Sequence, residues 1–368
     1  MKLVDRYWPN ARFHWYNGLL KDPKPYPQAS IWDAVPVFES LDQIALAAPT
    51  SGHIAAVVRF ANHAEIYWDP VLKPGPGYVP YPGGRGTHTK TYFDDNSVWG
   101  LAFMDAYRAT GNKRYLADAK RAMDFVIAYA WDAKDGGGLW WNTYYPRRHS
   151  EVLAMATDLA ARIYQATGTP LYLQTALKYT AWANQHLLKW DGSYAAQVPN
   201  VQLMPHDGEG AMVDAFTTLC EMKANVPASL YDRLPPNSVH RNPSLRRPSD
   251  PTSWCSWAQS VARKTAFGVN IGGRTFDRYM PLNDGPQYDA IYVRGLLSLY
   301  SLDHNRTWYK VAATAARRFL KNSADSAGRF LKNWNGSTRV PGADPGMLRT
   351  HAASVSVLAA LAATPPPS

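Results

Sequence analysis

The sequence predicts a single all-α domain, an α/α toroid in which helical hairpins pack side by side and close into a ring. A hairpin-like segment recurs along the chain, and apolar residues recur at helical spacing between most of the loops. No long stretch shows the alternating pattern of a β-sheet domain. With 46% hydrophobic residues in 368, the chain can bury a large core.

The repeat is clearest at residues 107–116 and 164–173, which share the pattern Tyr-x-Ala-Thr-Gly-x-x-x-Tyr-Leu, and a weaker copy lies at residues 300–309. Each copy ends one helix, turns at a glycine or a polar cluster and starts a second helix. Such a hairpin cannot bury its apolar face alone, so neighbouring hairpins must stack. The second helices are expected at residues 116–130, 173–188 and 309–320.

The first quarter of the chain is less regular. Residues 1–50 are rich in Trp and Pro and end in the segment 41–48. They are predicted to form an irregular arm and one short helix. Residues 53–67 have helical periodicity. Residues 69–90 are rich in Pro and Gly and are predicted to form a loop without secondary structure. A loop of that length in a compact domain usually has a function.

The second half contains the chief irregularity, residues 224–252, which are rich in Pro, Ser, Asn and Arg and are predicted to form a surface insertion. Helices are expected to resume after it. They are predicted at residues 257–267, 290–301 and 350–363. The predicted organisation is therefore an irregular N-terminal arm and first helix at 1–50, a helical barrel at 51–363 that would carry any active site, and a disordered Pro-rich tail at 364–368.

Charge and composition restrict the partners. The net charge of +10 suggests attraction to anions. However, Lys and Arg are scattered and form no basic stripe or known nucleic-acid-binding motif, so nucleic acid is not expected as a partner. The 14 Trp and 22 Tyr residues suit a groove that stacks flat ligands, sugars or bases. The longest apolar run, residues 352–363, is too short to span a bilayer.

The two cysteines, Cys220 and Cys255, fit no metal-binding spacing and no disulfide framework. They could pair or remain as two buried thiols. Residues 1–30 carry Trp, Pro and charges where a signal peptide would need an apolar segment. The protein therefore either stays inside the cell or is exported with a leader that is not part of this sequence.

Asp94 and Asp95 stand directly before a long helical pattern. Neighbouring Cα atoms are about 3.8 Å apart, so the two carboxyl groups must lie close together. Their repulsion should raise one pKa and lower the other, which suits a site that needs one proton donor and one charged nucleophile or base. The simpler interpretation is that one of them caps the helix, because acids are common at helix starts.

Three other polar segments, at residues 136–142, 204–210 and 283–294, also precede or begin a helix. In an α/α toroid, the starts of alternate helices gather at one end of the ring. We therefore expect these segments to form one site with the two aspartates. The candidate substrate-binding residues are Trp99, Trp140, Trp141, Asn142, Asp207, Glu209, Tyr288 and Asp289.

Other common chemistries lack their motifs. The sequence has no Gly-rich nucleotide loop, no Gly-x-Ser-x-Gly nucleophile and no His-Glu-x-x-His pair. Its ten His residues are dispersed. We therefore expect no cofactor and no metal ion, and the carboxylates set among aromatic residues remain the best candidates for catalysis.

At these motifs the chain resembles glycoside hydrolase family 76, the endo-α-1,6-mannanases and their relatives. The likeness rests on residues 92–99 with the double aspartate, on 110–116, on the Gly-Gly-Gly-Leu-Trp-Trp-Asn segment at 136–142 and on 283–294. The resemblance implies an (α/α)6 barrel and a retaining mechanism on α-mannan without a cofactor. By similarity, Asp94 would be the nucleophile and Asp95 the general acid/base.

Some positions depart from the family pattern. Phe93 replaces a Tyr and Val98 a Trp, while residues 207–210 and Asp289 add acid to the expected cleft. These changes leave the exact glycan open and allow a different glycosidic linkage or transglycosylation of mannan or a mannosylated glycolipid. A carbohydrate-binding protein without turnover is a further alternative. The resemblance also implies a protein, expected to be a monomer, that acts outside the cell or in the cell envelope, with the cytoplasm as the alternative.

Overall fold

The structure is a computed structural model, and its elements alternate between long helices and short ladders. It describes residues 2–367 except 21–27, 84–89, 135, 145–146, 189–193, 199–205, 231–249, 268, 272–273, 277–281, 283 and 339–345. The α-helices are α1 (Lys2–Tyr7), α2 (Ile31–Ala47), α3 (Ser51–Ala64), α4 (Phe93–Thr110), α5 (Lys113–Tyr129), α6 (Ser150–Thr167), α7 (Pro170–His186), α8 (His206–Glu221), α9 (Trp254–Phe267), α10 (Pro286–Asp303), α11 (Arg306–Asn322) and α12 (Leu348–Ala363).

The strands are all two or three residues long and pair as antiparallel ladders, β1 with β2, β3 with β4, β5 with β6 and β7 with β8. They occupy connections between helices. Their bounds are β1 (Pro9–Asn10), β2 (Trp15–Tyr16), β3 (Trp68–Asp69), β4 (Gly77–Tyr78), β5 (Arg148–His149), β6 (Gln197–Val198), β7 (Val269–Ile271) and β8 (Arg274–Phe276).

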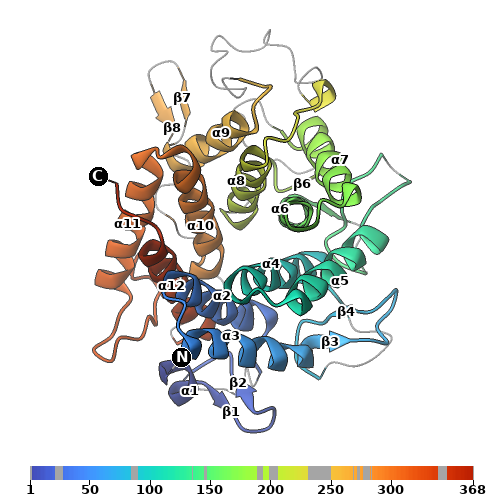
Figure 1. Ribbon diagram of the computed structural model, residues 1–368. Helices are drawn as coiled ribbons and strands as arrows, with labels where there is room; N and C mark the ends of the chain where they lie inside the picture. Colours follow the sequence, from blue (N-terminus) through green and yellow to red (C-terminus); the bar gives the residue numbers. More distant parts are fainter. Residues whose placement is uncertain are drawn as a thin grey trace.

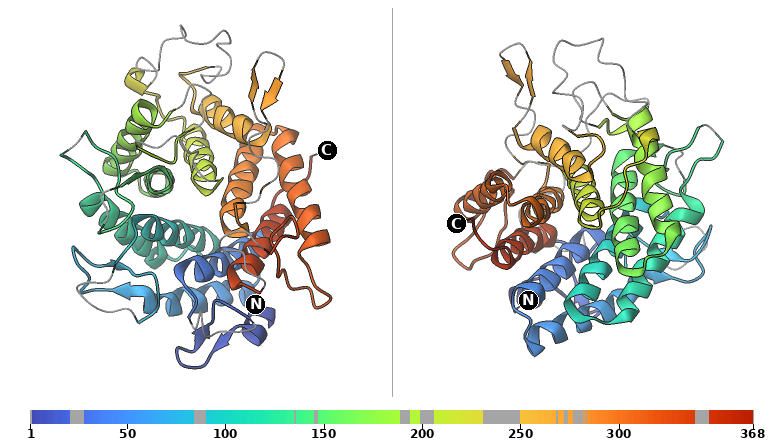
Figure 2. Two further views of the ribbon diagram at one scale, coloured as in Figure 1. Left: turned by 180° about the vertical axis from the view of Figure 1, so that it is seen from behind. Right: turned by 45° about the horizontal axis from the view of Figure 1, so that its top comes forward.

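The long helices form two concentric layers (Figure 1). Helices α2, α4, α6, α8, α10 and α12 form an inner ring in which each packs against the next, and α12 packs against α2 to close it. Figure 2 shows this closure as the blue and red helices lying side by side. Helices α3, α5, α7, α9 and α11 lie outside the ring. The chain is an (α/α)6 barrel, as expected.

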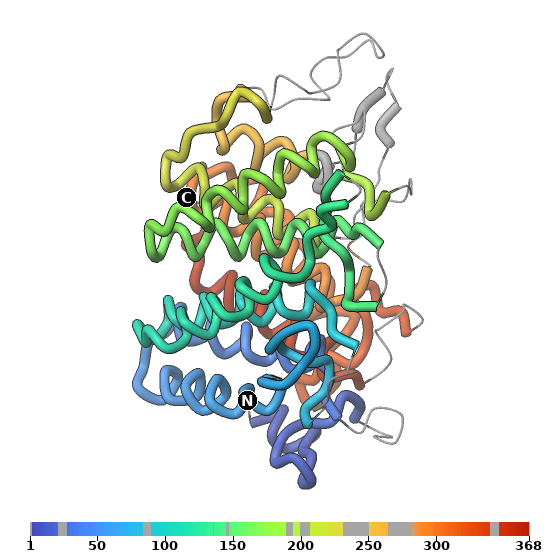
Figure 3. The backbone as a smooth tube through the Cα atoms, turned by 90° about the vertical axis from the view of Figure 1, so that its right-hand side faces the viewer, coloured from blue at the N-terminus to red at the C-terminus, as the bar shows by residue number. Residues whose placement is uncertain are grey.

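Tight turns explain why the inner helices all run in one direction. Gly111, Gly168 and His304 end α4, α6 and α10 in the left-handed region of the backbone. The outer helix begins two residues later and returns antiparallel to the inner one, and in a side view the helices of the hairpins lie roughly parallel to one another (Figure 3). These turns lie within the three copies of the sequence repeat. We call the two ends of the ring its N-terminal end, where the inner helices start, and its C-terminal end, where they stop.

The N-terminal part of the chain is more regular than the sequence suggested. Helix α2 has 17 residues and packs against α4 and α12, so the ring extends N-terminal of the range 51–363. Residues 69–90 are not wholly without secondary structure, because the ladder of β3 and β4 pairs Trp68 with Tyr78. Two-residue strands are too short to produce an alternating pattern. Most of the insertion predicted at 224–252 lies outside the described residues.

Cys220 and Cys255 form a disulfide between the end of α8 and the start of α9. The bond closes a loop with a sequence separation of 35 residues. We expect Cys220→Ala/Cys255→Ala to lower the free energy of unfolding by about 3–4 kcal/mol, because the unfolded chain regains the entropy of that loop. Urea unfolding measures this loss. Under reducing conditions the variant and the parent should unfold at similar urea concentrations, and an equal midpoint without reductant would contradict the prediction.

Candidate active site

Asp94 and Asp95 lie in the first turn of α4, at the N-terminal end of the ring. The N-cap position belongs to Tyr92, so neither aspartate is the capping residue of the simpler interpretation. The start of α4 is held instead by neighbouring segments. The Phe93 N–H donates to the carbonyl of Trp141 (3.0 Å), and the Asn96 amide bonds the backbone of Tyr78 in both directions. The carboxyl groups are therefore available for another task.

Both carboxyl groups are buried, with exposed fractions of 5% for Asp94 and 3% for Asp95. The indole N–H of Trp141 donates to Asp94 Oδ2 at 3.1 Å. Asp94 Oδ1 has no hydrogen-bond partner among the described residues. Asp95 accepts a hydrogen bond from Trp32 in the first turn of α2. One oxygen of Asp94 is thus free to react while the other is held in place.

Burial dominates the electrostatics of the pair. Burial first and the charge of Glu151 second raise the pKa of Asp94 to about 7, whereas Trp141 and His149 oppose the rise. Burial and the neighbouring Asp94 charge hold the pKa of Asp95 well above its usual range. The expectation that one pKa would fall is therefore wrong. The two protons still differ, because hydrogen bonding favours a charged Asp94 and that charge keeps Asp95 protonated.

Glu151 and His149 belong to the site but were not predicted from the sequence. His149 Nδ1 lies 3.5 Å from a Glu151 oxygen, and its ring stacks on Trp141 at 5.3 Å. Burial lowers the pKa of His149, but the Glu151 carboxylate outweighs it and the net shift is upward. Both residues stand at the start of the inner helix α6, so the rule that located the other motifs could have found them.

Three of the predicted binding residues gather at this end of the ring. Trp141 contacts Asp94 directly. The carboxyl group of Asp207, in the first turn of α8, has its pKa raised well above its usual range by burial, by Glu151 and also by Asp94. Tyr288, in the first turn of α10, packs edge-on against Trp32 at 5.0 Å between ring centres. Trp32 was missed because residues 1–50 were interpreted as an arm.

Trp99 and Trp140 lie elsewhere. Trp99 has an exposed fraction of 0% and packs against core rings that include Tyr67 and Tyr78. The backbone N–H of Trp140 donates to the carbonyl of Ala130 at 2.9 Å, at the end of α5. Consecutive residues of an extended segment point to opposite sides, so only one of the two tryptophans at 140 and 141 can face Asp94.

The remaining predicted residues are buried beside the site. Asn142 is fully buried and its Oδ1 accepts from the Tyr144 N–H at 3.0 Å, which shapes the turn after Trp141. Glu209 is buried. The pKa of Tyr194 is raised first by the burial of Tyr194 and second by the charge of Glu209. Asp289 is fully buried in the first turn of α10. Among the described residues, no group of three or more His, Cys, Asp or Glu side chains could hold a metal ion.

The arrangement suits cleavage of a glycosidic bond. The first turns of α2, α4, α6, α8 and α10 each bring a polar or aromatic side chain to one end of the ring. Helix N-termini favour negative charge, which helps Asp94 to ionise despite its burial. Glycoside hydrolases use a charged carboxylate beside a protonated one, together with aromatic side chains that pack against sugar rings.

The sequence profile of glycosyl hydrolase family 76 matches residues 3–202, which is 200 of the 368 residues. The chain belongs to glycosyl hydrolase family 76. It is a glycoside hydrolase. No curated protein matches the chain.

Solved structures of family 76 proteins share the fold. The mannosidase Bt3792 from Bacteroides thetaiotaomicron VPI-5482 is 18% identical with a TM-score of 0.76, over 98% of this chain and 96% of that one. The α-mannanase BT2949 from Bacteroides thetaiotaomicron is 18% identical with a TM-score of 0.75, over 98% and 93%. The α-1,6-mannanase GH76A from Salegentibacter sp. HEL1_6 is 16% identical with a TM-score of 0.70, over 98% and 96%.

In this family 76 hydrolase, the charge of Glu151 should set the acidic side of the pH profile. Glu151→Gln removes a negative charge that raises the pKa of Asp94. Asp94 should then ionise at lower pH, and the acidic limb of kcat/KM should move to lower pH. His149 opposes this shift, because it loses the partner that keeps it charged, but Glu151 is the larger influence on Asp94. Rates measured across pH test this, with Asp124→Asn on the exposed side of α5 as the control. An unmoved limb, or a limb at higher pH, would count against the role of Glu151.

Proposed function

We propose that this protein is a retaining endo-α-mannanase that cleaves α-1,6-mannosidic bonds, with Asp94 as nucleophile and Asp95 as general acid/base. The observation that carries the proposal is the geometry of the pair. Two buried carboxyl groups share one helical turn, and Asp94 is held by Trp141 through one oxygen while the other has no partner among the described residues. Retaining pairs lie about 5–5.5 Å apart and inverting pairs about 6.5–9.5 Å, and adjacent residues favour the shorter spacing.

The proposed reaction has two steps. Asp94 Oδ1 attacks the anomeric carbon of a mannosyl unit, the bond to the leaving oxygen breaks, and Asp95 gives its proton to that oxygen. Asp95, now charged, takes a proton from water, and the resulting hydroxide displaces Asp94 from the covalent intermediate. Two inversions leave the configuration unchanged. The pKa of Asp95, held high by burial and by the Asp94 charge, suits the donor role in the first step.

The choice of substrate is supported by the relatives. A variant of the Salegentibacter α-1,6-mannanase with two aspartates at adjacent positions replaced is described as inactive and was solved with α-1,6-mannotetrose. In our protein the corresponding chemistry would fall to Asp94 and Asp95. The aromatic side chains Trp32, Trp141 and Tyr288 surround the pair at the N-terminal end of the ring, where they could pack against the apolar faces of sugar rings.

Incubation with linear α-1,6-mannan tests the proposal. We expect short oligosaccharides of mixed length, with the new reducing ends formed first as the α-anomer in proton NMR. Longer chains would indicate transfer to another sugar, free mannose alone would indicate attack at chain ends, and retention on the polymer without products would indicate binding only. Any of these results would overturn the proposal. Activity should persist in EDTA, because a double displacement needs only carboxylates and water.

We also propose that the protein acts outside the cytoplasm. The disulfide between Cys220 and Cys255 supports this, because disulfides persist mainly in oxidising compartments. Within the described residues, no helix is long and apolar enough to cross a membrane. Alkylation of free thiols in intact cells, followed by mass spectrometry, measures the state of both cysteines. Two alkylated cysteines in freshly quenched cells would contradict the proposed location.

A further inference from the structure

A cavity lies at the C-terminal end of the ring, opposite the aspartate pair. Its volume is about 680 Å³, and all six inner helices line it. Asp105 in its wall follows Asp95 by ten residues of α4, which places it about 15 Å further along the helix. We call this space the lower cavity. Small-molecule sites commonly enclose about 300–1,000 Å³, so its size is that of a binding site.

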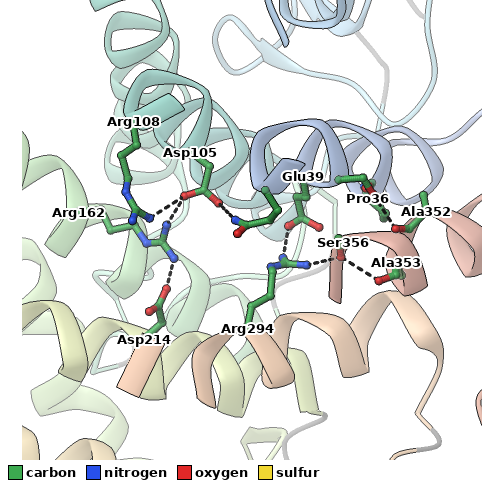
Figure 4. Close-up of polar contacts among 12 residues, drawn as sticks. Pro36, Glu39, Asp105, Arg108, Arg162, Asp214, Arg294, Ala352, Ala353 and Ser356 are labelled. Carbon is green, nitrogen blue, oxygen red and sulfur yellow. Dashed lines mark hydrogen bonds and ion pairs between the residues drawn. The ribbon is translucent and has the colours of Figure 1, made fainter. Parts of the chain in front are cut away.

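Ion pairs between the inner helices line the lower cavity at its inner end, and Figure 4 shows their contacts. Arg162 reaches from α6 to Asp105 of α4 at 2.9 Å and to Asp214 of α8, and it also bonds Asp158 on its own helix at 3.0 Å. Arg294 of α10 bonds Glu39 of α2 and, at 3.0 Å, Ser356 of α12. The two arginines therefore join all six inner helices across the middle of the ring. A small void of about 30 Å³ lies beside these ion pairs, lined by Val98, Leu101 and Gly210 among others.

The charges that line the lower cavity balance. Three arginines, Arg108, Arg162 and Arg294, face three acids, Asp105, Asp214 and Glu221. An anion would meet the three acids and the partial negative charge of the inner helix C-termini, and a cation would meet the three guanidinium groups. The balance therefore favours a ligand without net charge. It also distinguishes this cavity from the N-terminal end of the ring, where the acids Asp94, Asp95, Glu151 and Asp207 gather.

The other lining groups suit a ligand rich in hydroxyls. Gln165 donates to Glu221 at 2.8 Å, which fixes both side chains at the rim. The hydroxyl side chains Thr217, Thr218, Ser298 and Ser301 and the amide of Gln43 also line the space. Asp105 and Asp214 are each 7% exposed and are locked by Arg162, so the polar wall is rigid. Apolar surface comes from Leu46, Met104 and Leu297.

We infer that the lower cavity binds a neutral saccharide of one or two sugar units. Such a molecule carries many hydroxyl donors and acceptors, has no net charge and presents apolar C–H faces, which matches each property of the lining. The inference rests on the proposed function for the choice of a mannose sugar as the probe and for the sugar expected at the aspartate pair. It adds a second site, about two to three helical turns from the reacting groups.

The test counts sites by calorimetric titration of α-1,6-mannobiose into an Asp94→Asn/Asp95→Asn variant, which should not turn the sugar over. We expect two sugars bound per chain. Adding Ser301→Trp, which fills the cavity from α10, should remove one of them, and Ser326→Trp on an exposed loop outside the cavity should remove neither. Equal stoichiometry in the Ser301→Trp and Ser326→Trp proteins would overturn the inference.

A milder variant guards against loss of folding in Ser301→Trp. Gln165→Leu keeps the approximate size of the side chain but removes its amide. It should weaken saccharide binding in the lower cavity about tenfold, which is roughly the effect of losing one hydrogen bond to the sugar. Mannosamine and mannuronate, which carry one charge each, should bind there at least about tenfold more weakly than mannose. Tighter binding of either would refute a neutral ligand.

The two proposals can fail separately. For this comparison, Ser301→Trp is made in the protein that retains Asp94 and Asp95. This variant should cleave mannan at the parent rate at saturating substrate, because Ser301 lies far from the aspartate pair. A protein that binds mannobiose in the lower cavity but cleaves no mannan would sink the proposed activity and leave this inference standing. If the enzyme cleaves mannan, but one mannobiose binds per chain both with and without Ser301→Trp, the inference about the lower cavity fails and the proposed activity stands.

Discussion

Replacement of Asp94 by Asn is expected to reduce turnover of every glycoside to background. The amide cannot form the covalent intermediate, which the proposal assigns to Asp94 Oδ1, the oxygen that Trp141 does not hold. Activated and natural substrates should be affected alike, because both need the nucleophile. Steady-state rates with α-1,6-mannan and with an aryl α-mannoside measure the effect, and Asp124→Asn serves as the matched surface control.

Asp95→Asn should behave differently, because it removes a proton donor. General acid catalysis contributes about 10²- to 10⁴-fold, and an aryl leaving group needs little of that help. The variant should therefore lose most activity on mannan but keep a fast first step on the aryl substrate, with slow release that azide accelerates. If both Asn variants turned over nearly normally, the aspartates would have only a structural role, since Asn is accepted at helix starts about as well as Asp.

Arg162→Met is expected to lower the free energy of unfolding by about 3–5 kcal/mol, the cost of breaking a buried ion pair by removing one partner. The arginine faces carboxylates from three inner helices, Asp105, Asp158 and Asp214, and its removal leaves them buried without their common counterion. Urea unfolding at neutral pH measures the loss. Arg317→Met on the exposed face of α11 should change stability by no more than about 0.5 kcal/mol.

The pH dependence of this loss separates electrostatics from packing. At present Arg162 counteracts burial and keeps the pKa of Asp105 below its ordinary value. Without it, the folded-state pKa of Asp105 should rise above that of the unfolded chain, and the pKa of Asp158, which burial already raises to about 6, should rise further. The folded variant then binds more protons than the unfolded one, so its stability falls as pH rises. The deficit relative to the parent should therefore be smaller in mild acid than at pH 8, and a constant deficit would point to packing alone.

The sequence predicted the ring because its cause is local. Turn residues such as Gly111 and Gly168 and the periodicity around them specify hairpins, and hairpins with one apolar face must stack. The aspartate pair was also accessible, since it stands at a helix start of the inner ring. The same rule would have added His149 and Glu151, had it been applied to the first residues of α6 and not only to the glycine-rich segment before it.

Other features depend on contacts that no local pattern encodes. Trp99 lies in the core and Trp141 lies at the site, although both were candidates for substrate binding. Trp99 packs against Phe38 of α2 and Tyr78 of β4, whereas Trp141 bonds Asp94, and these tertiary contacts decide the two outcomes. The Arg162 contacts join residues 52 and 57 positions apart. The raised pKa of Asp95 follows from burial that exists only once the ring has closed.

The division of the site among inner helices has a consequence for how substrate range can change. Each hairpin supplies one sector of the binding surface through the first turn of its inner helix, while the ring contacts lie further along the same helix. The connection that leads into α6 is an example, because it carries Trp141, whose carbonyl holds the start of α4 and whose indole holds Asp94. A connection transplanted from a relative must therefore keep a tryptophan at position 141 to hold the two aspartates in place, while its other positions can change the glycan preference.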